Sequence, residues 1–135
     1  MTLAETGSVL TPIEGGKGVV RLEAGTVLHL VWDAGVRIEV ADARAAMEAV
    51  NLVAAGSSYP LLVDMAGTEY VSRQARTVFA APCAASRIAL LGASPVDRVL
   101  VDFQLGSQEP PCPTRFFISR VEATAWLHEA LDRPA

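Results

Sequence analysis

The stretch from Pro60 to Pro82, PLLVDMAGTEYVSRQARTVFAAP, holds the pattern that decides the fold. It begins with an almost unbroken apolar run over 61–65, which is typical of a strand buried on both faces of a parallel sheet. A turn around Gly67 follows. Ser72 then stands where a helix N-cap is expected, with apolar residues recurring behind it at helical spacing. The sequence therefore predicts a strand, a turn and a helix, in that order.

The residues before this unit predict an antiparallel hairpin and one helix. A short first strand is expected at 8–12, and the β-branched and large apolar residues at 19–22 and 27–32 are separated by a connection of hairpin length. The segment 42–55 is rich in alanine, methionine and leucine, has one apolar stripe and is followed by Gly56. We expect this helix to pack on the sheet.

The residues after the central unit repeat its pattern. A strand is predicted at 88–91, and Ser94 then begins a helix with proline and an acidic residue in its first turn. A short strand at 116–118 leads to a last helix, which Ser119 opens with a capping box.

These elements predict a single α/β domain over residues 1–135, with a mixed sheet in which a hairpin precedes parallel strand-helix units. The loops after Met65, Leu91 and Ile118 follow the carboxyl ends of parallel strands, so they should meet at one edge of the sheet. Open α/β sheets usually bind ligands at this carboxyl edge.

The composition restricts the partners of the chain. It is 51% hydrophobic and 19% charged, against roughly 25% charged for an average soluble domain. A net charge of -4 and a pI near 5.1 do not suit binding to a phosphate backbone, so we expect no nucleic-acid partner. The first residues have neither the basic nor the apolar part of an export signal, and no segment is apolar for long enough to span a membrane. We expect a cytoplasmic protein with both cysteines reduced.

With this order of elements the chain resembles STAS domains, which have the SpoIIAA-like fold of anti-sigma-factor antagonists and transporter tails. The resemblance covers nearly the whole chain, and LLVDMAG, VSRQAR, CAASRIALLGASPVDR and PTRFF are most similar to uncharacterised bacterial proteins described as STAS or CRAL-TRIO-like. It implies a non-enzymatic module, often dimeric, that regulates through contacts at the turn before the second helix. In the antagonists this turn holds an Asp-Ser-Ser-Gly type motif with a phosphorylated serine. The matching stretch here reads Val71-Ser72-Arg73-Gln74-Ala75.

Ser72 is the first candidate for a functional residue at the carboxyl edge. Each of the three helices predicted to begin at this edge opens with a serine, and the other two, one of them at Ser94, carry an acidic residue at the third position. The Ser72 helix has no such acid and has Arg73 and Arg76 in its first turn, so it offers amides and positive charge to a phosphate or carboxylate. The simpler interpretation, which the residues favour, is that Ser72 is only a helix cap and the arginines are solvated.

Asp64 is the second candidate, because a carboxylate in an otherwise apolar strand is costly unless it is hydrogen-bonded. We expect it to organise the turn at Gly67 and Thr68 by accepting backbone amides. A role as a catalytic acid would need a positioned partner, which the neighbouring sequence does not offer. The predicted binding or regulatory residues are Asp64, Gly67, Thr68, Ser72, Arg73, Arg76 and Ser94.

The remaining chemistry-bearing residues predict no cofactor, no metal site and no catalytic residue. Cys83 and Cys112 both precede predicted strands, which places them at the amino edge of the sheet and close together, but they lack redox or zinc spacing and are interpreted as packing thiols. His29 and His128 are not spaced as metal ligands.

Three functions are compatible with this sequence, in the order in which we favour them. The first is a cytoplasmic protein-interaction or regulatory module that acts through the 67–76 turn and the adjacent loops. The second is a domain that binds a small anionic or apolar ligand, or a lipid. The third is an enzyme of unknown class, for which the sequence offers only isolated polar residues.

We predict a homodimer, because a chain with this little charge carries more apolar surface than a monomer of its size easily buries. Sedimentation velocity at micromolar concentration should give the mass of two chains, and dilution should promote precipitation as apolar surface is exposed. A monomer at that concentration would contradict this prediction.

Overall fold

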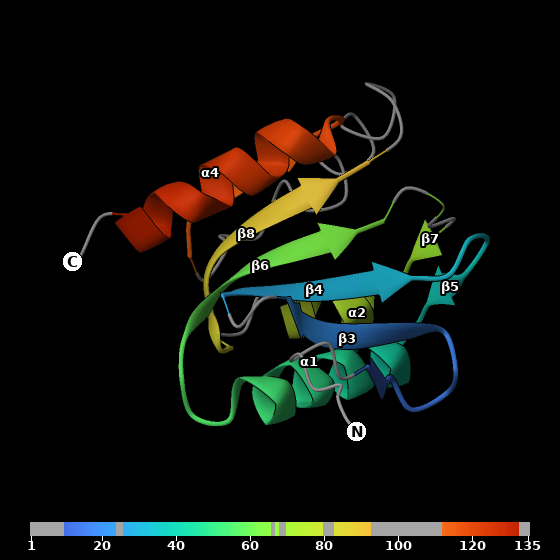
Figure 1. The fold of residues 1–135 in the computed structure, drawn as a ribbon. Coiled ribbons are helices and arrows are strands. Elements are labelled where there is room, and N and C mark those ends of the chain that lie inside the picture. The colour runs from blue at the N-terminus through green and yellow to red at the C-terminus, as the bar shows by residue number, and fades with distance from the viewer. Residues whose placement is uncertain are drawn as a thin grey trace.

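The computed structural model of the chain describes residues 10–23, 26–65, 67, 70–79, 83–92 and 112–132. Its elements are arranged around one large sheet (Figure 1). The strands are β2 (Thr11–Pro12), β3 (Gly18–Glu23), β4 (Val27–Trp32), β5 (Arg37–Ile38), β6 (Tyr59–Asp64), β7 (Tyr70–Val71), β8 (Ala85–Leu91) and β9 (Thr114–Phe117). The helices are α1 (Val40–Ala54), α2 (Arg73–Phe79) and α4 (Arg120–Asp132).

The large sheet has six strands in the order β2-β3-β4-β6-β8-β9. Strands β2, β3 and β4 are antiparallel neighbours, whereas β4, β6, β8 and β9 are parallel. The predicted α/β fold is therefore confirmed, with the hairpin first and the parallel strands after it. A separate pair of short parallel strands, β5 and β7, lies beyond the carboxyl ends of β4 and β6 (Figure 1).

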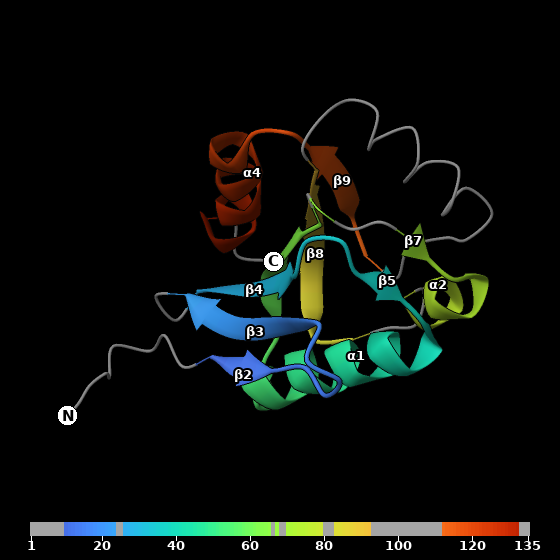
Figure 2. The same ribbon diagram turned by 90° about the vertical axis from the view of Figure 1, so that its right-hand side faces the viewer.

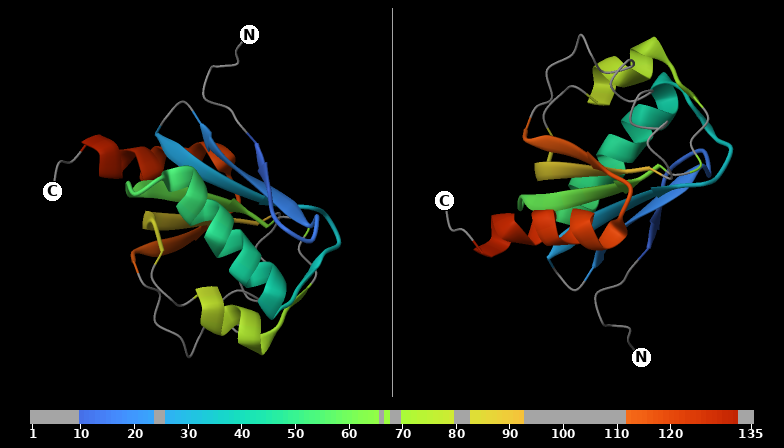
Figure 3. Two further views of the ribbon diagram at one scale, coloured as in Figure 1. Left: turned by 90° about the horizontal axis from the view of Figure 1, so that it is seen from below. Right: turned by 90° about the horizontal axis from the view of Figure 1, so that it is seen from above.

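Helices cover both faces of the sheet. Figures 2 and 3 show α1 and α2 on one side of the strands and α4 on the other. Successive residues of a strand point to opposite faces, so Leu61 is buried toward α1 while Leu62 is buried toward Ala123 and Leu127 of α4. This two-sided burial is the reason that β6 is apolar along nearly its whole length.

An ion pair joins the start of α1 to the turn between β2 and β3. One oxygen of Asp42, Oδ2, accepts from the Glu39 backbone N–H at 2.9 Å and from Lys17 Nζ at 2.8 Å. Burial alone would raise the pKa of Asp42, but the hydrogen bonds from Lys17 and Glu39 outweigh it and hold this pKa below its usual value. Helix α1 begins at Val40, two residues earlier than the predicted start at Asp42. Glu39 is the N-cap, so Asp42 is the third residue of the helix and not the first.

Two further predictions differ from the structure or lie outside it. The strand predicted at 116–118 occupies Thr114–Phe117, so Ile118 is not part of it and its side chain is 54% exposed. Ile118 is followed directly by the cap and first turn of α4, which ends the strand. The helix predicted to begin at Ser94 lies outside the described residues.

We expect Asp42→Asn to weaken the fold by about 1 kcal/mol at pH 7, because it removes the charge that pairs with Lys17. Since the folded-state pKa of Asp42 is lowered, this stabilisation is present above the unfolded pKa and is lost as the pH falls through the folded pKa. Urea denaturation from pH 7 to pH 3 should show the variant and the wild type converging at the acid end. Glu48→Gln, an exposed substitution on the same helix, is the control. A difference that stayed constant over this range would contradict the assignment.

Candidate functional site

The carboxyl edge of the sheet holds most of the residues that the sequence singled out. Asp64 ends β6, Gly67 lies in the following turn, and Ser72 directly precedes α2. Thr68 and Ser94 lie outside the described residues. Arg73 and Arg76 both belong to α2, which begins at Arg73.

Ser72 is a buried helix cap. Its side chain accepts a hydrogen bond at Oγ from the Ala75 backbone N–H at 3.1 Å, and its own N–H donates to the Ile38 carbonyl at 2.9 Å. The residue is only 4% exposed. Pairing of β5 with β7 accounts for this burial, because it places Ser72 directly beyond the end of the strand pair. The contacts of Ser72 in this structure are therefore those of a helix cap.

Gly67 holds the turn after β6 against the turn after β4. Its carbonyl accepts from the Gly35 N–H at 2.7 Å. A Cβ atom at position 67 would lie 2.7 Å from the Cα of Ala34, which is closer than non-bonded carbon atoms approach each other in proteins. Glycine at this position is therefore required by the packing of one backbone against another.

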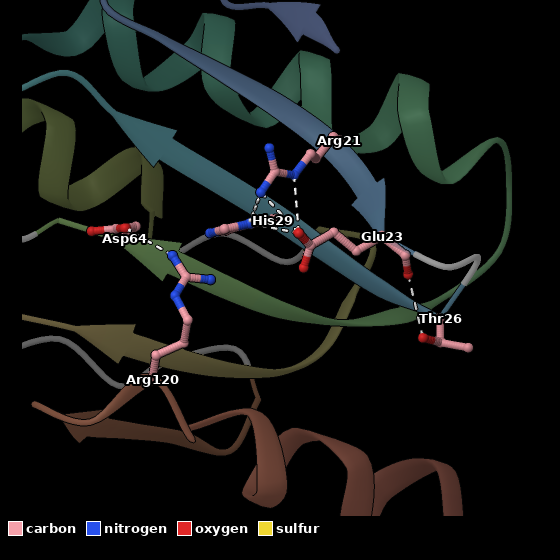
Figure 4. Close-up of polar contacts among 6 residues, drawn as sticks. All are labelled: Arg21, Glu23, Thr26, His29, Asp64 and Arg120. Atoms are coloured by element: carbon pink, nitrogen blue, oxygen red, sulfur yellow. Dashed lines mark hydrogen bonds and ion pairs between the residues drawn. The ribbon is translucent and has the colours of Figure 1, made fainter. Parts of the chain in front are cut away.

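Asp64 contacts the start of α4. Its Oδ2 lies 3.3 Å from Nη2 of Arg120, the first residue of that helix (Figure 4). The sequence predicted that Asp64 would organise the following turn and did not include Arg120 in the site. The sequence signal that could have indicated Arg120 is its position directly after the Ser119 cap, at the same edge of the sheet as Asp64.

A polar cluster on β3 and β4 was also missed. Arg21 and His29 are cross-strand partners, and Arg21 Nη2 lies 3.1 Å from His29 Nδ1 and 2.8 Å from Glu23 Oε2 (Figure 4). Burial lowers the pKa of His29; the Glu23 charge opposes this, while the charges of Arg21 and Arg120 add to it. Burial would raise the pKa of Glu23, but His29 and Arg21 outweigh it and hold that pKa below its usual value. The sequence indicates only that His29 lacks the spacing of a metal ligand.

The two cysteines are free and half-buried. Burial raises the pKa of the Cys112 thiol, and the nearby Cys83 raises it further. This effect of Cys83 on the pKa of Cys112 is consistent with the predicted proximity of the two thiols at the amino edge. Within the described residues, no group of three histidine, cysteine or acidic side chains is arranged to hold a metal ion. The helices in that part of the chain include none long and apolar enough to cross a membrane.

Comparison with known proteins gives a family and a fold. The model of a family described as a domain of unknown function, DUF7793, matches residues 20–131. A protein of unknown function from Arthrobacter sp. FB24 is 53% identical over 80% of this chain and 96% of its own, with a TM-score of 0.34 between the structures. None of the curated proteins matches the chain significantly.

A second solved structure supports the fold. It is an uncharacterised DUF3478-family protein with a SpoIIAA-like fold from Shewanella loihica PV-4, which is 14% identical over 94% of this chain and 98% of its own, with a TM-score of 0.56. The SpoIIAA-like fold implied by the sequence resemblance is confirmed.

We expect Ser72→Ala to lower the free energy of unfolding by about 1–2 kcal/mol, because it leaves the N–H of the fully buried Ala75 without its acceptor. Ser119→Ala is the matched control. In Ser119→Ala the Glu122 N–H loses its hydrogen bond to Ser119 Oγ, which is 3.2 Å long. This position is exposed, so water can replace the serine hydroxyl, and the free energy of unfolding should fall by less than about 1 kcal/mol. Chemical denaturation of both variants measures the difference, and equal losses would show that burial does not strengthen the Ser72 cap.

Proposed function

This chain belongs to the DUF7793 family, and we propose that it is a non-enzymatic regulatory module that binds a protein partner at the carboxyl edge of its sheet. The observation that carries the proposal is a pair of exposed apolar side chains where β9 leads into α4. Ile118 is 54% exposed and Val121 is 78% exposed, three residues further along the chain. Large apolar side chains that stay exposed within one short segment are a common feature of protein-binding surfaces.

The backbone around this pair is well fixed, which favours a binding role. The Ser119 side chain caps α4 between Ile118 and Val121, and Arg120 ties the same turn to β6 through Asp64. Across the edge, Gly67 is held by the hydrogen bond that its carbonyl accepts from the Gly35 N–H, and Ser72 is held by its cap on α2. A partner would therefore meet a preformed surface and would lose little binding energy to ordering it.

We further propose that the module acts in the cytoplasm and that it is a homodimer. The low charge content of the sequence supports the homodimer. The homodimer is independent of the carboxyl-edge surface, because the partner proposed for Ile118 and Val121 is a different protein.

The proposal can be tested by placing a photo-crosslinking residue at position 121 and, as a control, at position 52. Leu52 is 71% exposed on α1, so the two positions are equally accessible but lie on different elements. Crosslinking in native cells should capture a specific protein at position 121 alone. A captured protein that is a second copy of this chain, or equal crosslinking at both positions, would refute the proposal.

The purified partner should then bind Val121→Ser at least tenfold more weakly, about 1.4 kcal/mol, because the substitution removes apolar contact area. Leu52→Ser should bind as the wild type does. Both side chains are exposed, so both variants should keep the melting temperature of the wild type, and unchanged affinity of Val121→Ser would contradict the prediction.

A further inference from the structure

We propose that His29 and Arg120 form a binding site for an oxyanion, a carboxylate or a phosphate group, on the face of the sheet that carries α4. The inference goes beyond the proposed protein-binding role and does not depend on it, since it rests on the polar groups of β3, β4 and the start of α4.

The contacts of His29 fix the position of its proton. Two groups approach His29 Nδ1, namely Arg21 Nη2 at 3.1 Å and Glu23 Oε2 at 3.5 Å. A guanidinium can only donate hydrogen bonds, and the arginine nitrogen is the nearer group, so we assign Nδ1 as the unprotonated acceptor from Arg21. The same Arg21 nitrogen donates to Glu23 Oε2 at 2.8 Å, and the lowered pKa of His29 keeps the ring neutral near pH 7. The remaining nitrogen, Nε2, therefore carries the ring proton and is a donor.

This donor is buried and has no acceptor among the described residues. The His29 side chain is 1% exposed, and Nε2 lacks a hydrogen-bond partner. A buried N–H without an acceptor costs free energy, so such groups usually mark a position where a water molecule or a ligand is bound. In Figure 4 the Nε2 end of the ring points away from Arg21 and Glu23, toward the side on which Asp64 and Arg120 meet.

The charge beside Nε2 favours an anion over a neutral acceptor. Arg120 is close enough for its charge to lower the pKa of His29, and its guanidinium lies between the ring and α4 (Figure 4). It donates to Asp64 through one nitrogen at 3.3 Å, which leaves further N–H groups of the guanidinium to bind a second acceptor. The Arg120 side chain is 50% exposed, so it connects the buried ring with solvent.

The same geometry argues against a cation or a hydrogen-bond donor as ligand. A ring nitrogen that carries a proton cannot coordinate a metal ion, and Nδ1 is already occupied by Arg21. A carboxylate or phosphate oxygen accepts from both Nε2–H and the Arg120 guanidinium, and its charge is compensated by the arginine. Asp64 stays within reach of Arg120 and competes with the anion, which limits the affinity.

The test uses the full chain labelled with ¹³C and ¹⁵N, with NMR signals of the His29 ring as the readout. Sodium acetate and sodium phosphate are titrated separately at pH 7.5, and sodium chloride at matched ionic strength is the reference. We expect saturable shifts of the His29 signals with at least one of the two anions and none with chloride. Acetate and phosphate distinguish an organic acid from a phosphate compound as the source of the oxyanion.

A second readout separates binding from a structural role of Arg120. The bound anion should raise the pKa of His29, because a negative charge beside the ring favours its protonated form. Arg120→Met keeps the apolar stem and should raise the anion dissociation constant about tenfold or more. Arg44→Met removes an exposed arginine from α1, on the opposite face, and should leave it unchanged.

Several results would overturn the proposal. If acetate and phosphate change the His29 NMR signals no more than sodium chloride does, Nε2–H binds only water. If Arg120→Met binds the anion with the dissociation constant of the wild type, the anion binds elsewhere. The same conclusion follows if Arg44→Met weakens anion binding as much as Arg120→Met does. Because the first readout uses the wild-type protein, the proposal can fail even if a variant does not fold.

Discussion

Burial of β6 on both of its faces is the constraint on which the rest of this structure depends. Leu61 and Leu62 point in opposite directions, and each is almost completely removed from water, one toward α1 and the other toward α4. A strand of this kind cannot lie at an edge or face solvent. It requires neighbours on both sides and a helix over each face, and the order β4-β6-β8 with α1 and α4 provides them.

The same constraint determines where polar chemistry can lie. Along β6 the apolar residues end at Asp64, the first position at which a charged group reaches the carboxyl edge. Arg120 reaches Asp64 from the first residue of α4, across the end of β8. The ion pair therefore links the centre of the sheet to the helix that covers it, and it places a guanidinium beside the cluster on β3 and β4.

The parts of this fold that could be predicted from sequence are those set by local periodicity. The apolar run at 61–65, the hairpin at 19–32 and the capping serines at 72 and 119 each depend on residues close in the chain. The β5–β7 pair escaped prediction, because each strand has two residues and is specified by its distant partner. The Asp64–Arg120 contact is likewise set by tertiary packing, which joins residues 56 positions apart.

His29 shows which signal was overlooked and why it matters. Within Val27–Trp32 it is the one residue that breaks an apolar strand, and the hairpin register, with Glu23 opposite Val27, pairs it with Arg21. Ser72 attracted attention because its helix lacks an acid, yet its hydrogen bonds are satisfied within the backbone around it. A buried polar group that its neighbours satisfy stabilises a fold, whereas one left with an unpaired N–H adds to its cost. By this criterion the polar residue inside the apolar strand, and not the serine at the helix start, is the stronger indication of a binding site.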